Sequence, residues 1–457
     1  MGAPRVVVAG GGLAGLAAAL ELRAAGARVE LLERGRLLGG RTTSFVVEGE
    51  EVDNGQHVFL ACCTEFIDLV RRLGLGDRLH LQDRFDALVL PPGRPPARLR
   101  AAPLPAPWHL AVALARYGEL GWRDRLRVAR ALLALERAVG MEREPLSAWL
   151  DRRRQSPASR RAFWEPFFVP ALNAPLEEIS AAEAAFVVTT AFTAEAGAAR
   201  FGWLTVPLAR LAEAAAARLD QVRTRIPVTG LELGGDGEVR AVRTTEGPLA
   251  CDALVLALPP TRLARVLGEP ERFGLEAVRG FVSRPIVDVH LWHDAGWLGF
   301  GFAALLDAPV QWVFEKAPGY LCCSLSNAGA LVHRPEAELV RGCWEVVAGR
   351  LPGLGGARLR RGAATRSPEA TYVPAPGVRR PGPATRVPNL ALAGSWTATG
   401  WPDTMESAVR SGRAAARWLR ARWEGTAGAT PSRGRGLGSP VPALGRPEGR
   451  QGGIAVG

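Results

Sequence analysis

Lysine is almost absent from this chain, because Lys316 is the only lysine among 457 residues. The formal net charge of +12 is therefore carried by arginine, which together with 53 glycines and 35 prolines indicates a general compositional bias. The arginines are scattered, and no zinc-finger spacing or RNA-binding motif accompanies them. We therefore expect no nucleic-acid partner.

Cysteine and long apolar runs are also scarce. Six cysteines do not make a disulfide framework, and the adjacent pairs Cys62-Cys63 and Cys322-Cys323 lack the spacing of metal ligands, so no metal site is predicted. No apolar run reaches the roughly 18–20 residues that cross a bilayer. Residues 1–5 lead directly into a predicted strand, which argues against a signal peptide. We expect a cytoplasmic protein, with attachment to the inner face of the cell membrane left open.

Glycine, by contrast, is abundant and clustered near the start of the chain. A β-branched run, residues 5–9, is followed by Gly10-x-Gly12-x-x-Gly15 and an alanine-rich helical stretch. In a dinucleotide-binding turn the first glycine permits the sharp turn, the second lets backbone approach a pyrophosphate, and the third lets the helix lie close to the sheet. The pattern predicts strand, phosphate-binding turn and helix.

Two later features support a bound dinucleotide. A second predicted strand, residues 28–32, ends at Glu33, about 20 residues after the glycine turn, where an acid suits a ribose diol. Gly39-Gly40 then precedes Arg41, which brings a guanidinium behind a second pair of glycines. At the other end of the chain a predicted strand, 389–393, leads through Gly394 into a helix with free N–H groups at its start.

The order of predicted elements indicates an α/β protein with interleaved domains. A Rossmann-like nucleotide-binding domain is predicted from residues 1–80, 205–285 and 389–420. An α+β substrate domain, an antiparallel sheet with a helical insert, is predicted from 81–204 and 286–388. The remainder, rich in Gly, Pro, Ser and Arg, is predicted to be a disordered tail, 421–457.

Two stretches of the helical insert carry unusual composition. The helices within 103–140 place tryptophan near their starts and arginine on the polar face, which is typical either of a helix lying on anionic lipid or of an ordinary domain helix. The stretch 163–168 holds four large aromatic residues, which suit either core packing or the wall of an apolar cavity.

Taken together, these motifs resemble the flavoprotein superfamily of amine oxidases and phytoene-type desaturases, over residues 5–420. Within it, the chain is most similar to the hydroxysqualene dehydroxylases, also called squalene-associated FAD-dependent desaturases. The segments that carry this similarity are Asp53–His57, Asn173–Glu178, Gln311–Glu315 and Gly400–Ala408. The resemblance implies FAD as the cofactor and assigns Glu33 to the adenosine ribose. The full set of implied cofactor-binding residues is Gly10, Gly12, Leu13, Ala14, Gly15, Glu33, Arg34, Gly40, Arg41, Thr42, Val228, Gly394, Ser395, Thr404 and Met405.

The chain departs from the family at one of these positions. The family usually has Gly-Asp where this chain has Gly394-Ser395, and that acid hydrogen-bonds the ribitol and pyrophosphate region. A serine can still form a hydrogen bond, but the change predicts a weaker grip on FAD.

The activity that the resemblance implies is removal of the hydroxyl group from hydroxysqualene, an apolar isoprenoid, with hydride from reduced FAD. The sequence does not identify the external reductant, for which an NADPH-linked donor is one candidate. Candidate acids are Asp53, His57 and Glu315, each of which also suits a structural role. The expected substrate pocket is lined by Phe167, Phe168, Trp292 and Trp312. A carotenoid desaturase and a non-catalytic prenyl- or lipid-binding protein remain as alternatives. An amine oxidase is disfavoured. Such enzymes often have a lysine near N5 of the flavin, and Lys316, the only lysine, looks unrelated to that site.

Overall fold

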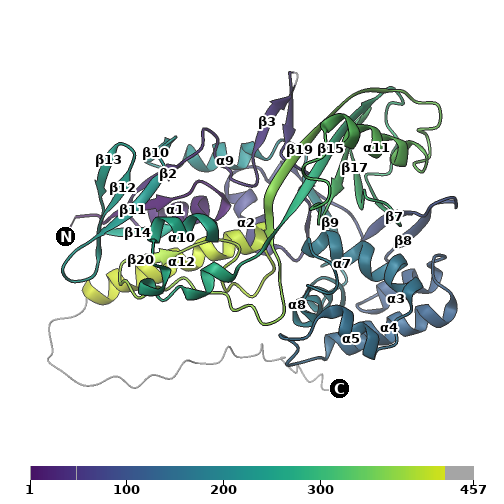
Figure 1. Cartoon of the computed structure of the whole chain (residues 1–457), viewed down its shortest axis with the longest axis horizontal. Helices are drawn as coiled ribbons and strands as arrows, with labels where there is room; N and C mark the ends of the chain where they lie inside the picture. Colours follow the sequence, from purple (N-terminus) through teal and green to yellow (C-terminus); the bar gives the residue numbers. More distant parts are fainter. Residues whose placement is uncertain (1, 48, 428–457) are drawn as a thin grey trace, which may run out of the picture.

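The computed structural model describes residues 2–47 and 49–427. Figure 1 shows two parts side by side: a parallel sheet with its helices, and a second sheet with a group of helices beneath it. The chain passes between the two parts several times, as the interleaved order of the elements requires.

The first part is built on a five-stranded parallel sheet. Its central strands are nearly free of exposed surface, since Val6, Val7 and Val8 are each at most 2% exposed. Continuous apolar strands of this kind are expected when helices or other layers cover both faces. The strand order is β10 (Gln221–Thr224), β2 (Arg28–Glu33), β1 (Arg5–Ala9), β14 (Ala253–Leu256) and β20 (Leu390–Leu392).

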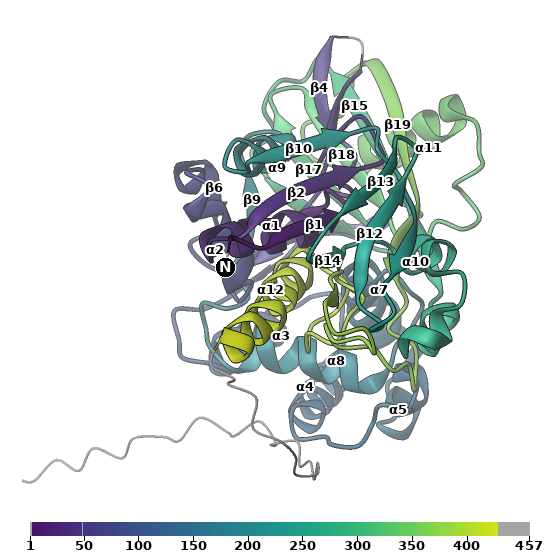
Figure 2. The same ribbon diagram turned by 90° about the vertical axis from the view of Figure 1, so that its left-hand side faces the viewer.

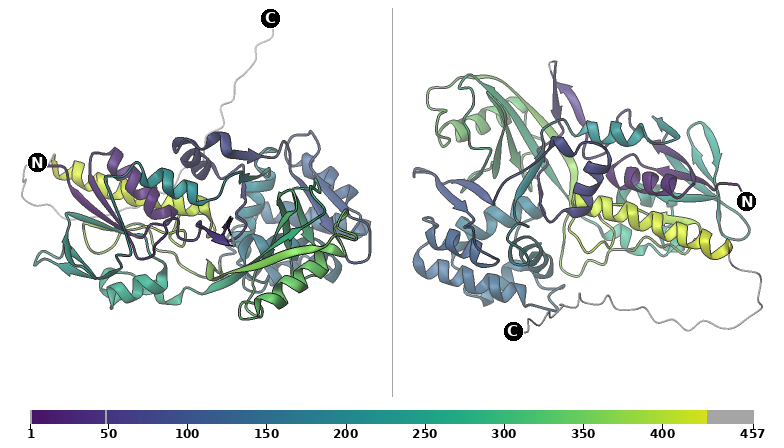
Figure 3. Two further views of the ribbon diagram at one scale, coloured as in Figure 1. Left: turned by 90° about the horizontal axis from the view of Figure 1, so that it is seen from above. Right: turned by 180° about the vertical axis from the view of Figure 1, so that it is seen from behind.

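Helices α1 (Leu13–Ala24) and α12 (Met405–Ala427) pack closely together on one face of this sheet. Figures 2 and 3 show them lying side by side, although they come from opposite ends of the sequence. The contact is unusually tight, because a Cβ added at Gly412 would lie 2.2 Å from the carbonyl oxygen of Ala14. Since α12 continues to Ala427, the predicted disordered tail does not begin at 421; residues 428–457 lie outside the described part of the chain.

Further elements complete the layers around the parallel sheet. Helices α2 (Thr64–Arg72) and α9 (Ala209–Ala216) share the core of α1 and α12. The opposite face is covered by α10 (Pro260–Leu267) and by a three-stranded sheet of β11 (Val228–Leu233), β12 (Val239–Thr244) and β13 (Gly247–Ala250). Short 3₁₀ turns follow at 76–78, 270–273 and 276–280.

The second part contains a seven-stranded sheet that is antiparallel except for one pair. The predicted antiparallel sheet is corrected at β16–β7, which run parallel because β7 is supplied by a separate, earlier segment of the chain. The order is β19 (Leu359–Tyr372), β15 (Ser283–His293), β18 (Tyr320–Leu325), β17 (Trp312–Ala317), β16 (Phe302–Leu305), β7 (Asp86–Leu90) and β8 (Ala97–Arg100). Helix α11 (Glu336–Ala348) covers one face of this sheet.

The helical insert has its own apolar core around Trp149, Trp164 and Phe168. The chain also contains two small sheets. The helical elements are α3 (Trp108–Arg116), α4 (Trp122–Glu136), α5 (Leu146–Arg152), α6 (Pro157–Ser159), α7 (Glu165–Leu172) and α8 (Ala181–Val187), with π-helical turns at 160–164 and 188–193. The small strands are β3 (Ser44–Val47) with β4 (Glu50–Asp53), and β5 (Phe59–Leu60), β9 (Phe201–Leu204) and β6 (Leu79–Leu81).

The contact between α1 and α12 gives a first prediction. Gly412→Ala should lower the free energy of unfolding by about 1–3 kcal/mol, because the new methyl group overlaps backbone of α1. The matched control is Gly342→Ala in α11, where a Cβ meets nothing within 4 Å and helix propensity should add up to ~1 kcal/mol. Urea unfolding measures both; equal effects of the two substitutions would contradict the tight packing.

Candidate functional site

The glycine turn after β1 forms a cradle that is tightly packed at Gly10 and Gly15 and open at Gly12. A Cβ at Gly10 would lie 2.4 Å from the carbonyl oxygen of Ala257, and one at Gly15 would lie 1.9 Å from that of Gly10. At Gly12 the nearest atom, Gly40 Cα, is 3.9 Å away. The first and third glycines therefore serve packing, and the second leaves room for a ligand against the backbone, as a pyrophosphate requires.

The predicted ribose-binding acid lies beside this turn. Glu33, at the end of β2, accepts hydrogen bonds from the N–H groups of Gly11 (2.8 Å) and Gly35 (2.7 Å), while Arg34 points to solvent. The N–H of Ile226 donates to the carbonyl oxygen of Glu33, which brings the start of β11, and with it the buried Val228, next to the same strand end.

Arg41 connects three segments that are far apart in sequence. Its Nη1 donates to Asp403 Oδ2 (2.8 Å) and to the carbonyl oxygen of Ala370 (2.6 Å), and its Nη2 donates to Asp403 Oδ1 (2.9 Å) and Ser395 Oγ (2.5 Å). Burial alone would raise the pKa of Asp403, but the guanidinium of Arg41 holds that pKa below its usual value. The carboxylate is therefore ionised and paired.

The start of α12 completes this edge of the site. The hydroxyl of Thr404 accepts from the N–H of Ser407, and Met405 begins the helix. Gly394 precedes the buried Ser395, and the N–H of Gly394 donates to Ser411 within the helix. A helix of 23 residues that starts here offers N–H groups and the positive end of its dipole to a ligand.

These segments fit a flavin nucleotide. The cradle at Gly12, the carboxylate of Glu33, the guanidinium of Arg41 and the start of α12 lie along the carboxyl edge of the parallel sheet, which is the usual position for a bound dinucleotide. Leu13 and Ala14 are buried in the first turn of α1, and Thr42 closes the turn at Gly39 through its hydroxyl. Within 2–47 and 49–427, no cluster of side chains could hold a metal ion.

A second group of polar residues lies on the seven-stranded sheet, on the face toward residues 53–57. Lys316 Nζ is 3.6 Å from Asp53 Oδ2. Asp288 lies against the backbone of Gly55, where an added Cβ would be 2.3 Å from Asp288 Oδ2. We call the set Asp53, His57, Asp288, His290, Lys316 and Tyr320 the polar strip.

The structure gives the three predicted acids different surroundings. Asp53 accepts hydrogen bonds from the hydroxyl of Ser44 and the N–H of Leu208, and so anchors the start of α9. Burial lowers the pKa of His57 to about 4, so this imidazole is neutral at pH 7. Glu315 lies outside the polar strip, because its carboxylate accepts the N–H groups of residues 298–300.

Four members of the polar strip, Asp288, His290, Lys316 and Tyr320, were not predicted as site residues from the sequence. Burial raises the pKa of Asp288 to about 7, despite hydrogen bonds from Ser324 and the Gln56 N–H. Lys316 was expected to be unrelated to the flavin site, which stays a prediction; it lies in β17, beside Asp53. The only available signal for Asp288 was its place at a polar position of an alternating apolar and polar strand. His290 Nδ1 is 2.7 Å from the hydroxyl of Tyr320, and burial lowers the pKa of His290 to about 4.

Next to the polar strip the same sheet face is aromatic. In register across four strands, Phe302 pairs with Phe314, Phe314 with Cys322, and Cys322 with His290. Directly opposite residues of paired strands point to the same side, so the aromatic and polar groups share one face, a few strands apart. We call the aromatic wall the set Phe85, Phe167, Phe192, Phe201, Phe302, Trp312 and Phe314, whose neighbouring ring centroids lie 4.8–6.2 Å apart.

Of the four residues expected in the substrate pocket, Phe167 and Trp312 belong to the aromatic wall. Phe168 is fully buried in the core of the helical insert, where it stacks on Trp164. Trp292 lies at the other end of the polar strip, stacked on Tyr320 with its Nε1 donating to Glu50. The sequence did not indicate the other members of the wall, because they come from five separate segments.

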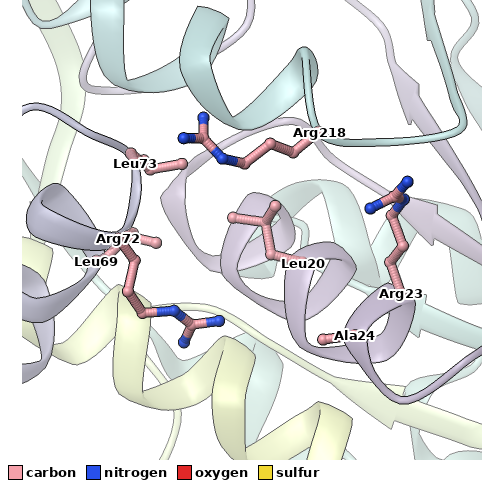
Figure 4. Close-up of a pocket in the computed structure, with 7 residues that line it drawn as sticks. All are labelled: Leu20, Arg23, Ala24, Leu69, Arg72, Leu73 and Arg218. Carbon is pink, nitrogen blue, oxygen red and sulfur yellow. The ribbon is translucent and has the colours of Figure 1, made fainter.

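The surface also has a hollow of about 370 Å³ between α1, α2 and the end of α9 (Figure 4). Arg23, Arg72 and Arg218 surround Leu20 there. Arg23 is paired with Asp220 and Arg72 with Glu21, so the positive charge is largely neutralised. This hollow lies behind α1, away from the glycine cradle.

Comparisons with known proteins point to the same class of cofactor. Residues 13–419 match the family described as flavin containing amine oxidoreductase. Hydroxysqualene dehydroxylase of Rhodopseudomonas palustris is 31% identical over 437 residues, covering 90% of this chain and 97% of that protein. 15-cis-phytoene desaturase of Synechococcus elongatus is 27% identical, covering 92% and 96%. Cyclohexylamine oxidase of Brevibacterium oxydans has the same fold, with a TM-score of 0.73 at 19% identity over 92% of this chain and all of the other.

The raised pKa of Asp288 gives a second prediction. A carboxyl whose pKa rises from 3.8 to about 7 on folding favours the folded state while protonated, and loses roughly 4 kcal/mol of that stability as the pH rises from 4 through 7. Asp288→Asn should remove this loss. Urea unfolding at pH 5 and pH 8 should therefore show the variant gaining stability relative to the wild type at pH 8.

The control for this prediction is the exposed Asp83→Asn, which should leave the pH dependence unchanged. A constant stability difference between Asp288→Asn and the wild type at both pH values would show that Asp288 is ionised throughout this range.

Proposed function

The chain belongs to the family of flavin-containing amine oxidoreductases and is a flavin-dependent oxidoreductase, and we propose that it binds FAD and reductively removes the hydroxyl group of hydroxysqualene to give squalene. The observation that carries this proposal is the shared sheet face, where a protonatable buried carboxyl stands beside an aromatic wall. A substrate with one hydroxyl group on a long hydrocarbon needs this combination. The similarity to hydroxysqualene dehydroxylase supports the choice of substrate.

The residues that would hold FAD come from the three segments of the nucleotide site. The Gly12 backbone and the first turn of α1 would receive the pyrophosphate, Glu33 the ribose diol, and Arg41 with the start of α12 the flavin side. When bound and reduced, FAD supplies a hydride. The electrons would come from an external reductant, for which an NADPH-linked donor is the class to test.

Loss of the hydroxyl group requires a proton on the departing oxygen. We assign this proton to Asp288, because it is the carboxyl of the polar strip that burial keeps protonated near neutral pH. The carbon–oxygen bond breaks with its electron pair on oxygen, which leaves as water, and the allylic carbon becomes positive. Lys316 and Asp53 pair with each other, so the two charges of this ion pair keep fixed positions beside Asp288.

The aromatic wall would bind the rest of the substrate. Burial of hydrocarbon contributes about 0.8 kcal/mol per CH₂ group, so a long isoprenoid needs no further polar contacts. Aromatic faces also stabilise nearby positive charge, which favours an allylic cation beside the wall over positive charge elsewhere on the substrate.

We also propose that the outer face of α3 and α4 rests on an anionic membrane surface, from which an apolar substrate can enter. Trp108, Trp122 and Leu126 are exposed there, at 64%, 69% and 44%. A hollow beside them is lined by arginines and apolar side chains: Arg130, Leu133, Ala134, Arg137, Ala138 and Arg153. This combination suits an interfacial helix. None of the helices in the described chain is long and apolar enough to cross a bilayer.

The reaction itself is the third prediction. Full-length protein, supplied with FAD, a chemical reductant and hydroxysqualene under anaerobic conditions, should release squalene and water, identified by mass spectrometry. With the FAD reduced and the reaction run in deuterium oxide, so that the exchangeable hydrogen of the reduced flavin is deuterium, the product should carry deuterium. Conversion of phytoene by the oxidised protein without squalene formation would instead identify a carotenoid desaturase. Binding of hydroxysqualene without turnover would identify a lipid-binding protein.

The membrane contact is the fourth prediction. Co-sedimentation with vesicles of phosphatidylcholine and phosphatidylglycerol should fall for Trp122→Ser, because an exposed indole contributes to insertion at the interface. The matched control is Trp297→Ser, which removes an equally prominent tryptophan, 58% exposed, from the far end of the second sheet. Equal binding of both variants and the wild type would contradict the assigned face.

A further inference from the structure

Arg41 contacts a carboxylate and a hydroxyl group that come from one loop. The guanidinium meets Asp403 through two parallel hydrogen bonds, at 2.8 and 2.9 Å, and its Nη2 also meets Ser395 Oγ. Ser395 and Asp403 are eight residues apart, yet both reach the same nitrogen. The loop 395–403 therefore folds back so that the two side chains share one position beside Arg41.

The burial of Asp403 shows that this pair is not a surface ion pair. Its side chain is 4% exposed, whereas that of Arg41 is 40% exposed. A carboxylate so deeply buried needs its partner, and a bidentate arginine contact is among the strongest that a carboxylate makes. The N–H of Tyr372, at the end of β19, donates a third hydrogen bond to it at 2.7 Å. Asp403 thus joins the start of α12 to the Gly39–Thr42 loop and to β19.

Ser395 is the uncharged neighbour of Asp403 in this contact, since its hydroxyl accepts from the same Nη2 of Arg41. We propose that Asp403 supplies the single carboxylate that Arg41 needs at the flavin site, and that it holds this guanidinium in position for the cofactor. One guanidinium can balance one buried carboxylate, so acids at 395 and 403 are alternatives. An uncharged residue at 395, such as serine, is therefore compatible with an ionised Asp403.

The proposal predicts a reciprocal pattern of FAD affinity. Asp403→Asn should weaken FAD binding roughly tenfold, since it removes the charge but keeps an oxygen for the Tyr372 N–H. Ser395→Asp should also weaken binding, because a second carboxylate is buried beside a single arginine. The double variant Ser395→Asp/Asp403→Asn should recover affinity to within about threefold of the wild type. The control is Glu369→Gln, a carboxylate near Arg41 without a direct hydrogen bond to it.

Full-length holoprotein would be diluted in steps, and the FAD released at equilibrium would be followed by its fluorescence. Recovery in the double variant supports the exchange of acids and shows that both substitutions are compatible with a folded, FAD-binding protein. Unchanged affinity in Asp403→Asn, or a double variant weaker than both single variants, overturns it. The inference rests on the proposed cofactor and not on the proposed substrate. A wild type that retains no FAD would refute the proposed function, whereas FAD binding without the reciprocal pattern refutes only this inference.

Discussion

The structure depends on a close approach of backbone around helix α1. Its first turn lies against the carbonyl oxygen of Gly10, and its other side lies against Gly412 of α12, at distances that leave no room for a side chain at Gly15 or Gly412. Packing at this distance fixes the relative position of the glycine turn and the start of α12. Both ends of the chain are thereby held at one edge of the parallel sheet, where Arg41 and Asp403 can meet although 362 residues separate them.

Local patterns were sufficient to predict the strand, turn and helix at the start of the chain and the strand and helix near its end. Gly10, Gly12 and Gly15 have the spacing of a phosphate-binding turn, and strand 389–393 with its following glycine predicted the second helix terminus. The relation between distant residues was not available from such patterns. The pairing of Arg41 with Asp403 depends on how the 395–403 loop folds, and the aromatic wall depends on the register of β16, β17 and β18. The exact extent of α12 was also missed, because a Gly- and Arg-rich composition begins before the helix ends.

The predicted acids illustrate why residue type alone does not identify a proton donor. Glu315 had the right chemistry, but three backbone N–H groups surround its carboxylate. Asp53 faces the single lysine, and His57 is kept neutral by burial. Asp288 was indistinguishable in sequence from an ordinary strand residue. Its raised pKa arises from burial, which outweighs the hydrogen bonds from Ser324 and Gln56 and the charge of Lys316.

The proposed function implies the direction in which the substrate lies along the second sheet. Asp288 and His290 mark the polar end of the shared face, and the aromatic wall extends from there through β17 and β16 toward Phe167 in α7. The helical insert that contains α7 also presents the exposed tryptophans of α3 and α4. A substrate bound by its hydroxyl group at Asp288 would therefore extend its hydrocarbon toward the surface that we assign to the membrane. The same arrangement places the charged groups beside the nucleotide site and away from the apolar entrance. One sheet face can therefore orient the substrate, with the reacting hydroxyl group at its polar end and the hydrocarbon bound at its aromatic end.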